Sequence, residues 1–239
     1  MKTFKVLLIS FSLLACGNLF SQPLIVIHLT GGYSLPAADL RGNVLDSLTS
    51  NYHTKNGFNI GGDAALGLGR LRSVRLLFSL QYHGFSNKSD NPVSSSVGYE
   101  KFSFNDMQIG AGVELALSPK STIDPFVSAE IISSFISGSR TFDKPDAGHV
   151  NADMNSATRY GLAIGAGLDF MLFKASGIGG VIGAKYHFAN LLGKSEGNNI
   201  FINTNYDLDD QTNGKNISFM SFYAGLTFYI GEPVKHYKK

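Results

Sequence analysis

The strongest constraint on this chain comes from long segments in which apolar side chains alternate with small or polar ones. In the segment 159–170 the even-numbered residues, from Tyr160 to Phe170, are all apolar. The odd-numbered residues, which have the other parity, are Arg159, Asp169 and small residues. A period of two is typical of a β-strand, whose successive side chains point to opposite faces. These runs exceed the ~5–6 residues of an ordinary strand. They match the ~9–11 residues that a tilted strand needs to cross a bilayer.

The same reading predicts eight strands. They lie near 24–34, 58–69, 74–86, 102–117, 123–138, 158–171, 178–188 and 217–230. Short connections at 70–73, 118–122 and 172–177 alternate with long polar ones at 35–57, 87–101, 140–157 and 189–216. A bilayer requires every backbone group to be paired, so the sheet must close. We therefore expect an all-β fold, an eight-stranded antiparallel up-and-down transmembrane β-barrel with short periplasmic turns and long extracellular loops.

Two runs break the alternation. In 102–117, Phe102 and Phe104 share parity with Gln108, so the apolar phase switches within one expected strand. A β-bulge near Asn105 and Asp106 would restore the phase. The run 123–138 is apolar on both faces.

The first 21 residues have the features of a signal peptide, with two lysines before an apolar core too short to span a bilayer. We expect cleavage between Ser21 and Gln22, and an alternative is lipidation of Cys16 within Leu-Leu-Ala-Cys. The expected organisation is a signal peptide over 1–21, a barrel domain over 22–230 and a short basic tail over 231–239. No other stretch is apolar enough for a transmembrane helix.

Composition separates the membrane reading from a soluble barrel. Charged residues make up 16% of the chain, against ~25% in soluble domains, and there is no Trp. A lipocalin-like barrel would need many charges on its water-facing exterior. Removal of the signal peptide takes away Lys2 and Lys5, leaving 18 bases to match 18 acids. A nucleic-acid partner is therefore not expected. The single Cys excludes an intramolecular disulfide framework.

The last strand resembles the end of small outer-membrane β-barrels of the OmpA, OmpX and OmpW type. Their terminal signal for the barrel-assembly machinery has a polar residue, a glycine and two hydrophobic residues at set spacing. Here those places are held by Tyr223, Gly225, Phe228 and Ile230. The chain departs from that pattern because Ile230 is not aromatic and the tail follows it. The run Gly-Tyr-Ser-Leu-Pro at 32–36 resembles first strands of Bacteroidetes-type barrels. The resemblance implies a Gram-negative outer-membrane location.

The small or polar parity of the strands predicts a polar network in the lumen. Its members are Asp63, Arg75, Gln81, His83, Gln108, Glu114, Glu130, Arg159, Asp169, Lys185 and His187. Buried charges are tolerated only when paired and hydrogen-bonded. An eight-stranded lumen is just wide enough for side chains to fill. We therefore favour a structural plug over a gated path for protons, ions or a small solute.

Other chemistry is weakly supported. Glu114 and Glu130 could form a glycosidase-like carboxylate pair, but inside a barrel no sugar would reach them. His83 and His187 lack a third ligand for a metal. The sequence therefore predicts no catalytic residue, no cofactor-binding residue, no metal site and no cofactor.

Three function classes stay open. The favoured one is a structural or interaction barrel, with surface loops that serve the envelope or a secretion machine. The alternatives are a narrow channel for small or apolar solutes and a lipid-modifying enzyme, for which His149 and Ser156 share one loop. Expected partners are outer-membrane lipid and lipopolysaccharide, the barrel-assembly machinery during insertion, and a further envelope protein.

Overall fold

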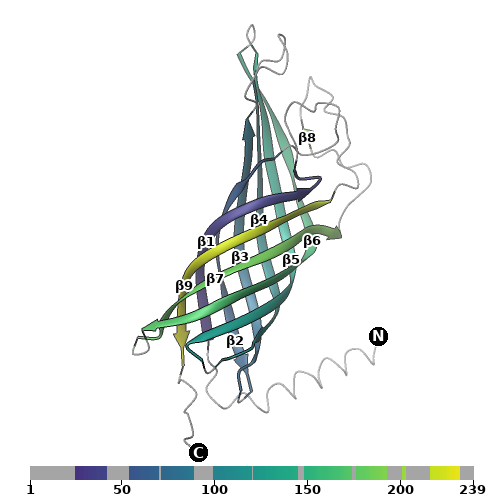
Figure 1. Cartoon of the computed structure of the whole chain (residues 1–239). Coiled ribbons are helices and arrows are strands. Elements are labelled where there is room, and N and C mark those ends of the chain that lie inside the picture. Colours follow the sequence, from purple (N-terminus) through teal and green to yellow (C-terminus); the bar gives the residue numbers. More distant parts are fainter. Residues whose placement is uncertain are drawn as a thin grey trace, which may run out of the picture.

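A computed structural model of the chain shows a closed antiparallel β-barrel (Figure 1). The structure describes residues 25–41, 54–69, 71–88, 99–119, 121–144, 148–173, 176–192, 201–202 and 216–231. The barrel strands are β1 (Ile25–Ala38), β2 (Gly57–Leu68), β3 (Val74–Lys88), β4 (Tyr99–Ala116), β5 (Ile123–Lys144), β6 (Gly148–Phe173), β7 (Ile178–Leu192) and β9 (Ile217–Ile230). Each strand pairs with the next along the chain, and β9 pairs with β1 to close the barrel. The expected fold class is therefore confirmed.

The two ends of the barrel differ. Short turns join β2 to β3, β4 to β5 and β6 to β7 at the end where β1 begins and β9 finishes, which we call the turn end. The opposite end, the loop end, carries the longer connections. Gly177 lies in one of the short turns with φ of +64°, a conformation that glycine adopts without strain. The predicted alternation of short and long connections holds except between β5 and β6, which only three residues, 145–147, join at the loop end.

One predicted loop is largely strand. The segment expected as a loop at 140–157 instead continues β5 and β6 as a paired hairpin up to Lys144 and Gly148. The register of β5 against β6 shifts between Ile136 and Gly138, while β5 stays paired with β4 in unbroken register as far as Asp143. The two-residue strand β8 (Phe201–Ile202) pairs with β6 in the same extension. In Figure 1 the hairpin rises well above the rest of the barrel.

The predicted bulge in β4 is absent. β4 pairs with β3 in unbroken register from Leu115 to Lys101. Phe102 and Phe104 are therefore on the inward parity, and both are buried. The phase change in the sequence reflects a change in what fills the interior, not a change of face.

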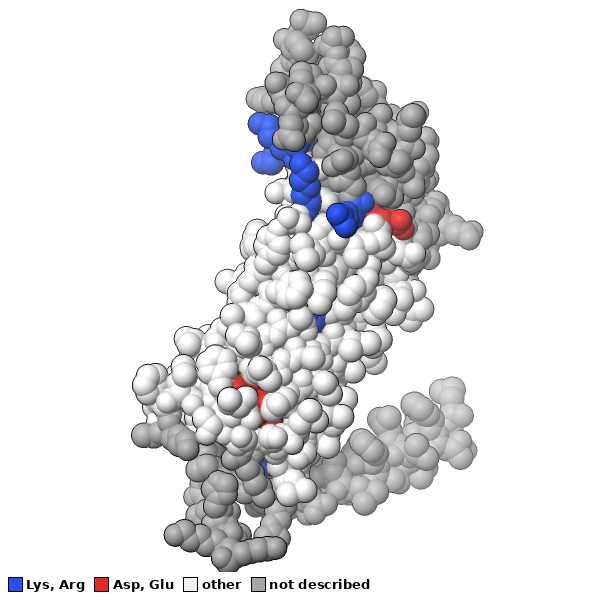
Figure 2. Space-filling model, in the orientation of Figure 1, with Lys and Arg blue, Asp and Glu red and all other residues white. Residues whose placement is uncertain are grey.

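The exterior between the two rims is apolar. Exposed side chains there include Leu29, Phe78, Ile109, Ile131, Ile164 and Leu226. Apart from Lys88 and Lys101 near the loop end, every described Asp, Glu, Lys and Arg side chain of the barrel strands is on the inward parity. Figure 2 shows an almost uninterrupted white belt in one view of the molecule. A belt of this kind suits lipid contact. No helix among the described residues is long and apolar enough to cross a membrane.

Candidate functional site

The barrel interior holds the side chains for which the sequence predicted a role. From the turn end to the loop end they form four layers, each tying together strands that are not neighbours. We call them the turn-end ionic network, the central pair, the histidine layer and the aromatic plug.

The turn-end ionic network centres on Arg75 of β3. Its Nη1 lies 2.7 Å from Glu114 Oε1 and 3.3 Å from Asp169 Oδ2, and its Nη2 lies 2.6 Å from Asp124 Oδ2. One guanidinium therefore contacts carboxylates from β4, β5 and β6. Arg75 and its three partners are all buried. The fork of donors on arginine is suited to contacts of this kind.

His28 of β1 extends this network to the opposite wall. Its Nδ1 lies 2.6 Å from Asp63 Oδ1 and its Nε2 lies 2.9 Å from Asp169 Oδ1. The contact with Asp63 is a hydrogen bond, whereas Nε2 and Asp169 Oδ1 lie within ion-pair distance without hydrogen-bond geometry. The ring also stacks on Phe126 at 6.1 Å between centroids. The network thus joins six consecutive strands, from β1 to β6.

The central pair is Lys185 of β7 with Glu130 of β5. Lys185 Nζ donates to Glu130 Oε1, and Ser79 of β3 donates to Oε2 of the same carboxylate. Both charged side chains are almost fully buried. The pair spans β6, where Gly165 leaves room: a Cβ there would lie 3.3 Å from Lys185 Cε. Glycine on the inward face therefore permits the ion pair to form.

The histidine layer lies next toward the loop end. His83 and His187 stand edge to face with 4.8 Å between ring centroids. His83 Nδ1 pairs with Ser34 Oγ at 3.1 Å, and His187 Nε2 pairs with Ser221 Oγ at 2.9 Å. Gln108 completes the layer, with Oε1 2.8 Å from His187 Nδ1 and Nε2 donating to Asp106.

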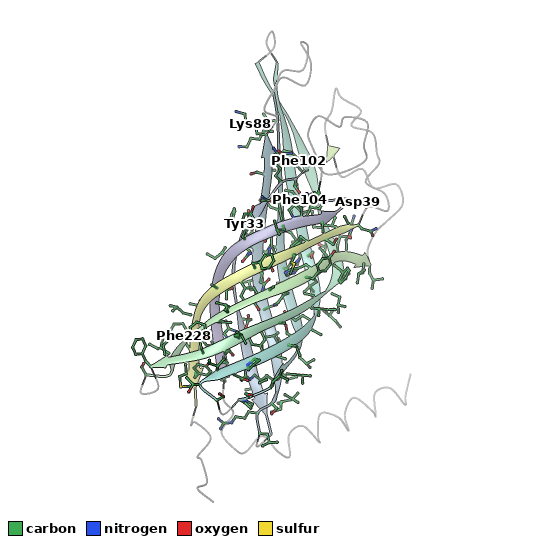
Figure 3. All side chains as sticks on the ribbon, viewed as in Figure 1. Tyr33, Asp39, Lys88, Phe102, Phe104 and Phe228 are labelled. Atoms are coloured by element: carbon green, nitrogen blue, oxygen red, sulfur yellow. The ribbon has the colours of Figure 1, made fainter. Side chains whose placement is uncertain are left out.

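The aromatic plug closes the loop end. It consists of Leu40, Phe85, Phe102, Phe104, Ile136, Ala189, Ile217 and Phe219, all at most 3% exposed. Phe219 links it to the histidine layer, because its ring stacks on His187 at 4.6 Å. Leu40 caps it from the β1–β2 connection, and its carbonyl accepts hydrogen bonds from the Thr54 backbone and hydroxyl. Figure 3 shows Phe102 and Phe104 on the loop-end half of the barrel.

Most predicted lumen residues lie where the pattern indicates. The residues that the structure joins into the three polar layers are Asp63, Arg75, His83, Gln108, Glu114, Glu130, Asp169, Lys185 and His187. Gln81 is inward beside Gly61 and half-buried. Arg159 is on the inward parity, opposite the buried Ser134, but it is only partly buried near the loop end and donates to the carbonyl of Thr158, so it does not join the polar layers.

Three charged or ionisable members were not predicted. His28 directly follows a run of four apolar residues, 24–27, that hides the alternation, and Asp124 is the second residue of its strand. Asp106 sits where the expected bulge would have turned it outward. Counting parity through β4 without a bulge would have found it. Two aromatic side chains, Phe85 and Phe126, are also buried inside the barrel.

The arrangement holds the barrel together and offers no open reaction centre. Both histidine–serine pairs have a base and a hydroxyl within hydrogen-bond reach. Their side chains are nevertheless fully buried under the aromatic plug. Glu114 and Glu130, considered above as a glycosidase-like pair, lie in different layers: Glu114 bonds to Arg75 and Glu130 to Lys185. In the part of the chain that the structure covers, no three His, Cys, Asp or Glu side chains are grouped to hold a metal ion.

No family model and no curated protein matches the chain. Among solved structures, it is similar to Neisserial surface protein A, with 15% identity, a TM-score of 0.46 and coverage of 85% of this chain and 96% of that one. It is similar to Ail, the attachment invasion locus protein of Yersinia pestis, in complex with the heparin analogue sucrose octasulfate (16%, TM-score 0.40, 87% and 100%). A third is the outer membrane protein AlkL in lipid bilayers (11%, TM-score 0.38, 89% and 91%).

The chain is thus a small eight-stranded β-barrel of the outer-membrane type, as the resemblance of its last strand implied. That assignment rests on its own strand pairing and apolar belt. The Bacteroidetes-type detail and the assembly signal at Tyr223, Gly225, Phe228 and Ile230 stay predictions. The cleavage site Ser21–Gln22, Cys16 and the tail from 232 onward lie outside the described residues.

Proposed function

We propose that this protein is a non-enzymatic outer-membrane barrel with a sealed interior, acting as a structural or interaction element of the cell envelope. One observation carries the proposal: the four interior layers fill the barrel from the turn end to the loop end. Arg75, Lys185, His187 and Phe219 each belong to a different layer, and each is at most 3% exposed. A solute path would have to break a buried ion pair, displace the histidines and part the plug.

The apolar belt supports the membrane location. A water-soluble barrel would not leave Ile60, Phe78 and Ile131 more than half exposed while it buried its charges. Together with the expected signal peptide, the belt favours an outer membrane, with the turn end in the periplasm. The loop end would then face the cell exterior.

The extended hairpin of β5 and β6 supports an interaction role. Beyond Gly138 its strands stay paired through Lys144 and Gly148, and β4 stays paired with β5 as far as Asp143. A paired hairpin holds its shape where a loop would not, so it is suited to present residues at a distance from the membrane. Its partners, including a further envelope protein, stay proposals, as does assistance from the barrel-assembly machinery.

Conductance tests the sealed interior. The full-length protein would be refolded into planar phosphatidylcholine bilayers, and folding confirmed by a mobility difference between boiled and unboiled samples on an SDS gel. We expect no steady channel current where an outer-membrane porin gives steps in the same bilayers. Reproducible steps that depend on the solute would contradict the proposal and favour the narrow channel.

The run 123–138 is apolar on both faces, which would suit a channel for apolar solutes, but the structure explains this pattern differently. β5 is apolar on both faces because Phe126, Ile132 and Ile136 pack inside while Ile131 and Phe135 face outward. For the lipid-modifying enzyme, Ser156 is exposed on β6, but the side chain of His149 is outside the described part of the chain. Unchanged lipid A profiles on overexpression are expected, and a new lipid species would contradict the non-enzymatic role.

A further inference from the structure

Basic side chains gather on one side of the loop-end rim. Arg41 and Lys55 are exposed, and they are neighbours because Arg41 pairs with Thr54 in an isolated bridge. Lys88 and Lys101 are exposed and directly opposite each other across β3 and β4. We call these four residues the basic band; they lie above β1, β2, β3 and β4. Figure 2 shows blue groups at the upper edge of the white belt.

The band has the character of an anion site. Like charges directly opposite each other on two strands are destabilising, so a dianion between Lys88 and Lys101 would be attracted by both. The described acid nearest this rim along β1, Asp39, accepts a hydrogen bond from the Asn216 backbone at the start of β9. Oδ2 of its carboxylate is thus bonded to β9.

A groove lies in the apolar belt below the same four strands. It encloses about 620 Å³ and is lined on the outside by Leu29, Gly31, Ile60, Gly62, Leu80 and Met107. Two glycines among large apolar residues make the hollow. A Cβ at Gly31 would have no neighbour nearer than 3.7 Å, whereas one at Gly62 would come within 2.7 Å of the His28 carbonyl.

The spacing of band and groove fits one amphiphile. Lys88 and Tyr82, which borders the groove, are six residues apart on β3. At ~3.3 Å per residue and a tilt of ~40°, the difference in depth is about 15 Å, or half of a ~30 Å hydrocarbon core. Between them Phe58 stands against Tyr82, with 5.8 Å between ring centroids. Figure 3 shows Lys88 above Tyr33 on the barrel.

We propose that the face formed by β1 to β4 binds one phosphorylated lipid of the outer leaflet, with its phosphate on the basic band and an acyl chain in the groove. The inference rests on the outer-membrane location proposed above. Charge complementarity selects the headgroup, and continuity between band and belt selects a lipid over a soluble anion. On the far side of the barrel, Arg159 is the described basic residue of the β6 rim, and it serves as a control.

Native mass spectrometry of the refolded full-length protein tests this site. The protein in detergent micelles would be offered bisphosphorylated lipid A or the same lipid after removal of both phosphates. We expect one bisphosphorylated lipid retained per barrel, and at least tenfold less of the dephosphorylated form. The triple variant Lys55→Gln, Lys88→Gln, Lys101→Gln lowers the retained fraction at least tenfold. Gly31→Leu, which fills the groove, lowers it at least threefold.

Two matched controls should keep retention within twofold of the parent. Arg159→Gln removes a rim charge on the opposite side, and Ala166→Leu enlarges an exposed side chain of the belt on β6. Every variant is first checked for the boiled–unboiled gel shift. If the triple variant fails to fold, the single Lys101→Gln replaces it, with at least a twofold loss expected.

The inference is overturned if the band and groove variants retain the lipid as the parent does, or if both forms of lipid A are retained equally. These outcomes are separate from failure of the proposed function. A folded, non-conducting barrel that retains no lipid refutes the lipid site alone. Steady conductance from a barrel that retains the lipid refutes the sealed interior alone.

Discussion

Lys185 and Glu130 form an ion pair across the strand that separates them, passing over Gly165 where β6 carries no side chain. The contact joins opposite sides of β6 deep inside the barrel. Because both groups are buried, each depends on the other for compensation of its lost hydration. The pair therefore holds β5 to β7 only as long as both partners are present.

Replacing one partner should be costly. Lys185→Met leaves the buried Glu130 carboxylate with the Ser79 hydroxyl and no cation beside it, and we expect the free energy of unfolding to fall by ~3–5 kcal/mol. The double variant Lys185→Met, Glu130→Gln should recover much of that loss, because no uncompensated charge remains. The measurement is urea unfolding in phosphatidylcholine vesicles, followed by the folded band of unboiled samples. Arg159→Met serves as a control, with an expected change of at most ~0.5 kcal/mol. A double variant less stable than the single one would refute the argument.

A second glycine makes room for the same carboxylate. A Cβ at Gly110 would lie 2.7 Å from Glu130 Oε2 and would also crowd the Ser79 hydroxyl. We expect Gly110→Ala to lower the free energy of unfolding by ~1–3 kcal/mol through overpacking. Gly31→Ala is the matched control, because its Cβ meets nothing nearer than 3.7 Å. Equal urea midpoints for the two variants would show that Glu130 has space to move.

Much of the barrel follows from sequence periodicity. All eight predicted strands exist, and parity alone places Arg75, Lys185 and His187 inside. This succeeds because a side-chain period of two and a lipid exterior impose the same alternation on every strand. The pairing of these charges did not follow, because contacts such as Arg75 with Asp169 join residues 94 positions apart.

The expected bulge in β4 and the expected loop at 140–157 were wrong because the simple alternation applies only to the middle of the barrel. Parity predicts polar residues inside an eight-stranded barrel, but near the loop end the interior is aromatic. Phe102 and Phe104 therefore broke the expected pattern although their strand is regular. The hairpin at 140–157 was missed for a related reason: above the membrane neither face must be apolar, so a polar strand and a polar loop have similar compositions.

The aromatic plug should contribute more stability than the belt does. Phe104 is fully buried inside, whereas Phe78 is 58% exposed on the outside of β3. Phe104→Ala removes buried area and leaves a cavity, which costs ~3–5 kcal/mol. Phe78→Ala also loses transfer free energy, but lipid chains can fill the gap, so the loss should be smaller. Urea midpoints in the same vesicles compare the two directly. A larger effect at Phe78 would mean that the plug is not well packed.

The β5–β6 hairpin should be separable from the barrel. Gly138 and Met154 are direct partners across the two strands, so residues 139–153 can be replaced by Asn-Gly, the preferred two-residue hairpin turn. The deletion removes the β5 partners of β4 residues 99–103, among them Arg140 opposite Phe102, but it removes no side chain of the four interior layers. We therefore expect the gel shift to persist, with at most a small fall in the urea midpoint. If the hairpin presents an interaction surface, surface cross-links to a partner in intact cells should disappear while the barrel remains in the outer membrane. Loss of folding would instead make the hairpin part of the barrel's own stability.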